Sequence, residues 1–452
     1  MLKILLKLNV VFIPVWFSTQ IFAWGEHPLG SYPALRALPE LQNAKPVVVE
    51  TLESFLNKEK EGIAELLKQT EQWSVENLES YAPMPAELAF QVKGEGTLES
   101  RFKAALRINP DFKTLSYVQM LPGEQRQGCN RIKVDKISIF PDNHYLEHLV
   151  ICEVKPGQTA LPVEIAATAS DEPDYGLDIG LFENNKTEFG ARYGFSTQPF
   201  GNPELVFSSQ APFHMGFFHE AWIVYKLASF LKRTYPHYRA RQYMELSKYA
   251  FKTGHDYWGY RFMGWGLHYI QDLTQPYHST STPNMGTLKK LWVNFLAILG
   301  FDSGMKNLIQ LLSNAHLALE DVQRQIMTRL IQAQENEHSI LQAVADLQND
   351  QQYGDYDERY IKAVLTTESN GKAEALSDLI EEYFPADIVL NPQNKYDSHS
   401  GSENAYDIIA RDTPQNFTVI EASIADLFRS FGSHTRNYAR AALSAKPGYG
   451  NP

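Results

Sequence analysis

Two histidines and one aspartate stand among apolar and aromatic residues in the segment 264–278, which reads GWGLHYIQDLTQPYH. His268 and Asp272 are four residues apart, so on a helix both side chains lie on one face and can reach a single ion. Pro276 cannot continue such a helix, so the chain should turn just before His278 and bring that imidazole back over the helix end. The segment therefore has the side chains and the spacing of a metal site.

A second pair of possible ligands follows in the pattern NAHLALEDV, where His316 and Glu320 are again four residues apart. One such pair is weak evidence, because a histidine on an apolar helix face is more often a hydrogen-bonded core residue. Two pairs of histidine with carboxylate, with a Pro-x-His sequence between them, favour a Zn²⁺ site between packed helices.

The first residues indicate export. MLKILLK carries two lysines, LNVVFIPVWF is an apolar run of about the length of a signal-peptide core, and STQIFA ends on the small residue Ala23. This pattern predicts a signal peptide over residues 1–23, with cleavage between Ala23 and Trp24. The apolar run is too short to span a bilayer comfortably, and no other segment has the length of a transmembrane helix. We expect a secreted protein, extracellular or periplasmic, with no transmembrane anchor in the mature chain.

The composition supports a packed core and argues against a nucleic-acid partner. The 452 residues are 44% hydrophobic, and the formal net charge is −12, whereas nucleic-acid binding typically uses a basic surface. The chain has two cysteines, Cys129 and Cys152. Export permits a disulfide between them, which would be worth about 3 kcal/mol by loop closure, but the sequence leaves the pairing open.

Hydrophobic periodicity predicts a largely helical chain. Residues 93–165 differ, because RIKVDKISIF and YLEHLVICEV alternate polar with β-branched residues and predict a short hairpin. The Gly-, Pro- and Asn-rich residues 166–213 and the polar residues 391–407 are predicted to be loops. Helices are expected over 45–92, 219–233, 241–253, 256–272, 314–348, 357–384 and 418–443.

HYIQDLTQPYH resembles the H-Y-x-x-D-x-x-x-P-x-H signature of the bacterial zinc-dependent phospholipases C, relatives of the S1/P1-type nucleases, and His316-x-x-x-Glu320 resembles the H-x-x-x-E that follows it. The resemblance implies an all-helical core that holds three divalent ions, usually zinc. It is strong over about 240–320 and thinner over 166–220. The core would comprise residues 24–44 and 166–452, with an insertion at about 282–313. Residues 45–165 would be a larger insertion, helical with a β-hairpin.

The resemblance also implies roles for particular residues. Members of this family begin, after signal removal, with a Trp whose amine and carbonyl oxygen bind a metal, and Trp24 is in that position. His27 would join it. His268 and Asp272 resemble the ligands of the central helix, with Asp272 bridging two ions. The third ion would be held by His278, His316 and Glu320.

The family has two more ligands, an Asp and a His, upstream of the central helix. SDEPDYG offers Asp171 and Asp174, with Asp178 close behind, and the Pro-Asp-Tyr context favours Asp174. The same residue would orient or deprotonate the attacking water. APFHMGFFHE offers His214 and His219; His214 is narrowly preferred, because it lies in a Pro-containing stretch expected to be non-helical.

The implied activity is that of a phospholipase C, which hydrolyses glycerophospholipids at a membrane surface to diacylglycerol and a phosphorylated headgroup. A nuclease or nucleotidase on the same metal core is the first alternative, and a non-catalytic secreted metal-binding protein is the second. The net charge favours lipid. TLKKLWVNFLAILGF, residues 287–301, either lies in the lipid interface or forms an ordinary core helix, and the core helix is the preferred interpretation.

Overall fold

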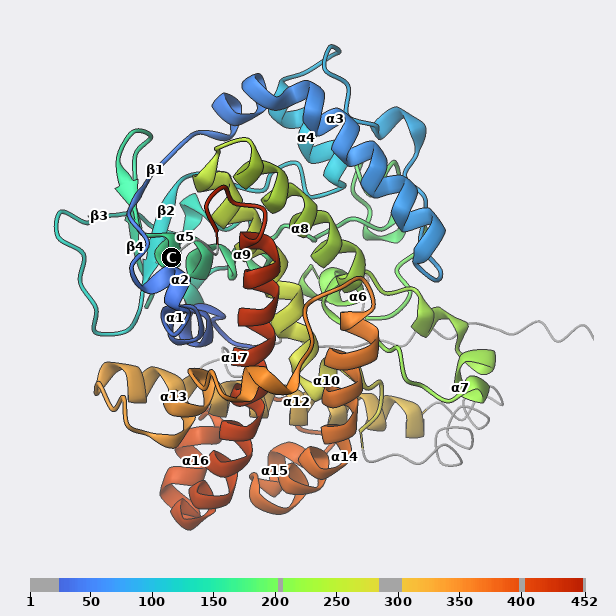
Figure 1. Cartoon of the computed structure of the whole chain (residues 1–452). Coiled ribbons are helices and arrows are strands. Elements are labelled where there is room, and N and C mark those ends of the chain that lie inside the picture. The colour runs from blue at the N-terminus through green and yellow to red at the C-terminus, as the bar shows by residue number, and fades with distance from the viewer. Residues whose placement is uncertain (1–23, 202–205, 284–302, 398–402, 450–452) are drawn as a thin grey trace, which may run out of the picture.

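The protein is mainly helical: of the residues that the structure describes, 59% lie in helices and 4% in strands. The computed structural model describes residues 24–201, 206–283, 303–397 and 403–449, and Figure 1 shows a small β segment at the left edge of the molecule, beside a much larger helical body. This agrees with the expected mainly-α fold with an inserted α+β part. The predicted signal peptide, residues 1–23, lies outside the described residues, as do residues 287–301.

Helices and strands are mixed up to α5, and the described residues after it contain helices alone. The first half contains α1 (Pro28–Arg36), α2 (Pro39–Gln42), β1 (Val47–Val48), α3 (Leu52–Asn77), α4 (Leu98–Leu106), β2 (Tyr117–Met120), β3 (Asn130–Arg131), β4 (Val150–Glu153), β5 (Thr159–Ala160) and α5 (Pro162–Ala169). The rest contains α6 (Ala211–His214), α7 (Trp222–Leu227), α8 (Pro236–Lys252), α9 (Asp256–Thr274), α10 (Pro276–Ser279), α12 (Ser303–Gln332), α13 (Ser339–Val344), α14 (Thr366–Tyr383), α15 (Ala386–Val389), α16 (Ala405–Asp412) and α17 (Phe417–Leu443).

Single turns of tighter or wider helix join these elements. They are η1 (Ala86–Leu88), η2 (Val134–Lys136), η3 (His144–Leu146), η4 (Glu172–Tyr175), η5 (Glu183–Asn185), η6 (Phe207–Gln210), η7 (Ser229–Lys232), η8 (Asn349–Gln352), η9 (Ile361–Leu365, a π-turn) and η10 (Pro414–Asn416). Two of them, η3 and η4, lie beside the site described below.

Helix α9 is the centre of the fold. Every residue after its first, Asp256, is buried, and α5, α8 and α17 pack against it. Gly264 and Gly266 permit this close packing: a Cβ on Gly264 would lie 2.5 Å from Ala166 O of α5, and one on Gly266 would collide with the Tyr438 hydroxyl of α17. The chain leaves α9 at Thr274, before Pro276, as the sequence predicted, and Pro276 then begins the one-turn helix α10, which the sequence analysis did not predict.

The predicted hairpin is present only in part. β4 pairs antiparallel with β3, and Arg131 lies opposite Cys152, but the rest of RIKVDKISIF is not strand. The other neighbour of β4 is β2, whose register places Val118 opposite Cys152. This strand was missed. Cys129 and Cys152 form a disulfide with their Cα atoms 5.1 Å apart.

Several predicted helix boundaries were wrong. The helix expected over 45–92 is α3 alone, and Pro83 and Pro85 follow it in irregular chain. The single helix expected over 219–233 is two short pieces, α7 and η7. The loops expected over 166–213 and 391–407 contain the end of α5, most of α6 and the start of α16, and His214, expected in a non-helical stretch, is the last residue of α6. Within the described residues, no helix has both the length and the apolar character that crossing a membrane requires.

Candidate metal centre

Eight of the predicted ligands meet in three groups inside the protein, and the first two groups share His268. The ligand atoms of each group lie within 4.8 Å of one another. The first group is His27, Asp174 and His268, the second is His214, His268 and Asp272, and the third is His278, His316 and Glu320. All eight side chains are buried. They come from the segment before α1, from η4, α6, α9, α10 and α12, so the packing of distant elements creates the site.

Asp272 lies between the imidazoles of the first two groups. Its Oδ1 is 3.3 Å from His27 Nε2, and its Oδ2 is 2.8 Å from His214 Nδ1 and 3.3 Å from His268 Nε2. The two oxygens of this carboxylate thus face different imidazoles. Such an arrangement suits a carboxylate that is shared by two cations.

Hydrogen bonds to the protein aim particular ring nitrogens into the site. His27 Nδ1 lies 2.8 Å from Gln271 Oε1, and His268 Nδ1 lies 2.8 Å from Ser170 O. Because both partners are acceptors, each Nδ1 carries the proton, and each Nε2 is left with its lone pair pointing into the site. This is how proteins usually orient the histidines that bind metals.

The third group is built in the same way. His278 Nδ1 lies 2.8 Å from the carbonyl oxygen of His214, which directs His278 Nε2 towards His316 Nε2, 3.2 Å away. Glu320 Oε1 is 2.6 Å from His316 Nε2, and the Tyr277 ring stacks on the imidazole of His316. The i,i+4 spacing on α12 therefore places His316 and Glu320 together, as predicted.

The residues present fit divalent cations. Several buried polar atoms of the site have no hydrogen-bond partner in the described part of the chain: His27 Nε2, His214 Nε2, both carboxylate oxygens of Asp272, and Glu320 Oε1. A buried polar atom without a partner is costly, and buried carboxylates are normally paired or bound to a metal. Imidazole nitrogens with carboxylate oxygens are also the donor set that Zn²⁺ prefers.

The protonation states favour cation binding as well. Burial lowers the pKa of His278 and of His316 to about 3, so both imidazoles are neutral at pH 7 and can act as ligands. Burial, and then the charge of Asp272, raise the pKa of Asp174 and of Glu320 well above the usual range. A nearby cation favours the ionised form of a carboxyl group, so it would offset the cost of burying these two.

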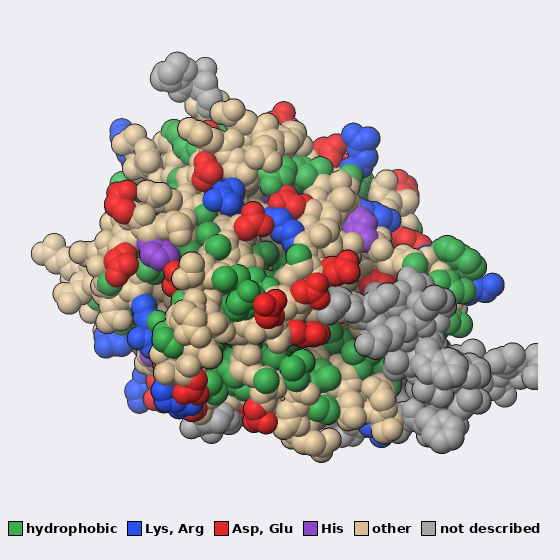
Figure 2. All heavy atoms as spheres, turned by 90° about the horizontal axis from the view of Figure 1, so that it is seen from below, with side chains coloured by type: hydrophobic (Ala, Val, Ile, Leu, Met, Phe, Trp, Pro, Cys, Tyr) green, Lys and Arg blue, Asp and Glu red, His purple; other side chains and the backbone are tan. Residues whose placement is uncertain are grey.

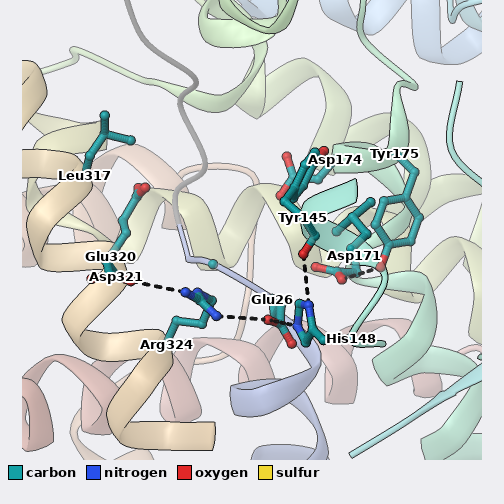
Figure 3. A pocket seen from close by; sticks show the side chains of 12 residues that line it. Glu26, Tyr145, His148, Asp171, Asp174, Tyr175, Leu317, Glu320, Asp321 and Arg324 are labelled. Atoms are coloured by element: carbon teal, nitrogen blue, oxygen red, sulfur yellow. Dashed lines mark hydrogen bonds and ion pairs between the residues drawn. The ribbon is translucent and has the colours of Figure 1, made fainter. Parts of the chain in front are cut away.

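A pocket of about 110 Å³, large enough for several water molecules, adjoins these groups. Figure 3 shows Asp174 and Glu320 facing it from opposite walls. Tyr145 and His148, from the chain around η3 in the inserted segment, contribute a third wall. His148 Nε2 lies 2.7 Å from Glu26 Oε1, and this carboxylate raises the pKa of His148.

The structure separates the alternatives that the sequence left open. His219 lies outside the three groups, with its Nε2 2.9 Å from Thr366 Oγ1, so His214 is the candidate ligand. Asp174 is in the first group, so it is the candidate ligand. Asp171 instead accepts hydrogen bonds from the His27 backbone N–H and from the Tyr175 hydroxyl, and it helps to position His27.

Trp24 and Asp178 lie next to ligands without belonging to the three groups. The Trp24 indole is buried, and its Nε1 donates to Gln271 O, which fixes the first described residue to α9. Asp178 Oδ2 accepts from the Tyr269 hydroxyl and lies 3.8 Å from His214 Nε2. The buried Arg239 guanidinium holds the other oxygen of Asp178.

Sequence reasoning missed the supporting residues. Gln271 binds His27 through Oε1 and donates through Nε2 to Ser31 and Thr435, and Gln210 donates to Asp174 Oδ1. The position of Gln271 directly before Asp272 was the available signal. Comparison of the chain with family models, with curated proteins and with solved structures found no match.

Proposed function

We propose that the protein is a secreted, zinc-dependent phospholipase C that hydrolyses glycerophospholipids to diacylglycerol and a phosphorylated headgroup. The observation that carries the proposal is the set of three adjoining groups of buried histidines and carboxylates, whose unpartnered atoms point at one another beside a pocket. The resemblance of HYIQDLTQPYH to the phospholipase C signature supplies the reaction class.

The proposal assigns three ions to the groups. His27, Asp174 and His268, together with Trp24, would hold the first ion. The second ion would be held by His214, His268 and Asp272, and the third by His278, His316 and Glu320. Divalent ions held there would activate water and offset the negative charge of the phosphoryl group in the transition state.

The charged groups that line the pocket support the binding of cations there. Its walls carry five carboxylates, from Glu26, Asp171, Asp174, Glu320 and Asp321. One guanidinium, from Arg324, lies among them, so cations held by Asp174 and Glu320 would supply the positive charge that a phosphodiester needs in this pocket.

The chain's own residues would then orient the reactants. Asp174 faces the pocket and would accept the proton of the attacking water on a carboxylate oxygen. The oxygen of that water would attack phosphorus, the bond from phosphorus to the glycerol oxygen would break, and the leaving alkoxide would take up the proton that Asp174 had accepted, giving diacylglycerol and the phosphorylated headgroup. Leu146, Leu317 and the Tyr145 ring add apolar surface to the pocket, which suits a lipid better than a nucleotide. The net charge of −12 points in the same direction.

The test is a side-by-side assay of the mature chain, beginning at Trp24, on phosphatidylcholine, phosphatidylglycerol and single-stranded DNA, with and without chelator. Chelator-sensitive release of diacylglycerol is the expected result. Cleavage of the DNA with no release from either lipid would replace the proposal with a nuclease. No turnover of any of the three substrates by zinc-loaded protein would leave a metal-binding protein without hydrolase activity.

A further inference from the structure

Helix α7 presents apolar side chains to solvent. Trp222 is 72% exposed and Leu227 is 48% exposed, although tryptophan is among the residues that proteins bury most effectively. In Figure 1, α7 projects from one side of the molecule, and Figure 2 shows hydrophobic side chains at the same edge. We call Trp222, Lys226 and Leu227, the exposed residues of α7, the α7 tip.

The α7 tip stands on a small hydrophobic core of its own. Its members are Phe200, Ala211, Met215, Phe217, Val224, Ala228 and Leu231, separate from the main core. In addition, the Tyr225 hydroxyl donates to Phe217 O at 2.6 Å. Because packing and hydrogen bonding hold the helix in place, the exposure of Trp222 is a feature of the folded surface.

The same small core reaches the candidate metal centre. Ala211 and Met215 belong to it, and they flank the segment that carries His214. Gly216 N donates to the carbonyl oxygen of the ligand His278 at 2.8 Å. A surface bound through the α7 tip would therefore be held at a fixed position relative to two of the candidate ligands.

Charge at this place differs from the charge of the whole chain. The stretch 220–233 carries Lys226, Lys232 and Arg233 against the single carboxylate of Glu220, whereas the net charge of the chain is −12. Lys226 Nζ lies 5.8 Å from the centre of the Trp222 ring, so the ammonium and the exposed indole form one surface. Lys232 is paired with Glu79.

We propose that the α7 tip is the surface through which the protein docks on a phospholipid bilayer that contains anionic lipid. Tryptophan is enriched at the level of the lipid headgroups, because its ring is apolar and its N–H can bind polar groups there. Leu227 would enter the acyl boundary, and Lys226 would attract anionic headgroups. The inference rests on the proposed phospholipase function and adds the face of the protein that meets the substrate.

The test measures flotation of the mature chain with two sets of vesicles, pure phosphatidylcholine and a mixture with phosphatidylglycerol. Trp222→Ala and Leu227→Ser should each weaken binding to both sets roughly tenfold, since each removes a large apolar side chain from the interface. Lys226→Glu should weaken binding mainly to the vesicles that contain phosphatidylglycerol, and the difference should shrink at high salt.

Leu390→Ser is the matched control, because Leu390 is 50% exposed, close to the value for Leu227, and follows α15. It should leave vesicle binding unchanged. Equal losses in Leu227→Ser and Leu390→Ser would overturn the assignment. The assignment would also be overturned if the protein were a dimer that Trp222→Ala converts to a monomer without changing vesicle binding. The α7 tip would then be a contact between two copies of the chain.

Hydrolysis of bis(p-nitrophenyl) phosphate, a soluble phosphodiester, separates the two proposals. The tip variants should hydrolyse it at the rate of the unaltered chain, since none of the three residues lies among the candidate ligands. Chelator-sensitive hydrolysis without any vesicle binding would refute the docking surface and leave the proposed chemistry intact. Vesicle binding that depends on Trp222, in a protein without hydrolase activity, would refute the proposed function alone.

Discussion

Glu320 provides a test in which one substitution should change stability differently with and without metal. The carboxyl group is buried, Oε1 has no hydrogen-bond partner among the described residues, and burial raises its pKa well above the usual value of 4.5. In metal-free protein the raised pKa opposes folding above pH 4.5, and at pH 7 this costs at most about 3 kcal/mol, because each pH unit above 4.5 corresponds to about 1.4 kcal/mol. Glu320→Gln removes this cost and should stabilise the metal-free protein.

The sign of the pH dependence follows from the raised pKa. Because the pKa of Glu320 is higher in the folded metal-free chain than in the unfolded chain, the folded chain binds more protons at this group between the two pKa values, so this contribution to stability falls as pH rises. The contribution is fully present below the unfolded pKa, near 4.5. The gain from Glu320→Gln in chelator should therefore shrink as pH is lowered from 7 towards that value.

With zinc bound, the same substitution removes an anionic ligand. Even groups that only support a ligand change metal affinity by 10- to 100-fold, so loss of the ligand itself should weaken binding by about 100-fold or more. At saturating zinc this removes about 3 kcal/mol of the stabilisation that zinc binding adds, which offsets the gain in chelator, so the substitution should stabilise the protein in chelator and give no net gain in zinc. The assay is thermal or urea unfolding followed by circular dichroism, in chelator and in zinc.

Asp321→Asn is the control, since Asp321 is the next residue on α12 and is also buried, but its carboxylate pairs with Arg324 and accepts from the Tyr396 hydroxyl. It should destabilise the protein equally in chelator and in zinc. If Glu320→Gln also changed stability by the same amount and sign in both conditions, Glu320 would not be a metal ligand.

Two further predictions concern the scaffold. Gly266→Ala should lower the free energy of unfolding by about 1–3 kcal/mol, because the added Cβ meets Tyr438. Gly371→Ala, within α14 and with open space around it, should raise the free energy of unfolding by up to about 1 kcal/mol. Urea unfolding measures both changes. Replacing both Cys129 and Cys152 with Ala should lower the free energy of unfolding by about 3 kcal/mol, because the disulfide no longer closes the loop between two residues that are 23 positions apart. An unchanged free energy of unfolding would contradict the loop-closure argument.

The features that the sequence predicted best are those that depend on helix periodicity alone. His268 with Asp272, and His316 with Glu320, share a helix face because they are four residues apart, and no tertiary information is needed to place them together. Pro276 likewise ended α9 where expected. The convergence of the two pairs depends on how the helices pack, and the resemblance to a known family supplied that step.

Other features depended on tertiary packing that leaves little trace in the sequence. Gln271 acts through His27, which is 244 residues away, so only the folded chain shows its role. Strand β2 is almost wholly buried and lacks the alternation that marks an exposed strand. The break between α7 and η7 falls at Ala228, with φ −130° and ψ 60°, and no Gly or Pro announces it. By contrast, Pro83 and Pro85 did signal the end of the first predicted helix, and the prediction ignored them.

The most direct test of the metal centre is anomalous diffraction at the zinc edge from crystals of the mature, zinc-loaded protein, together with the zinc content of the same preparation. The account predicts an anomalous peak within each of the three groups, and loss of the peaks beside Asp272 in the Asp272→Asn variant. Zinc-loaded crystals without an anomalous peak between these imidazoles and carboxylates would contradict it.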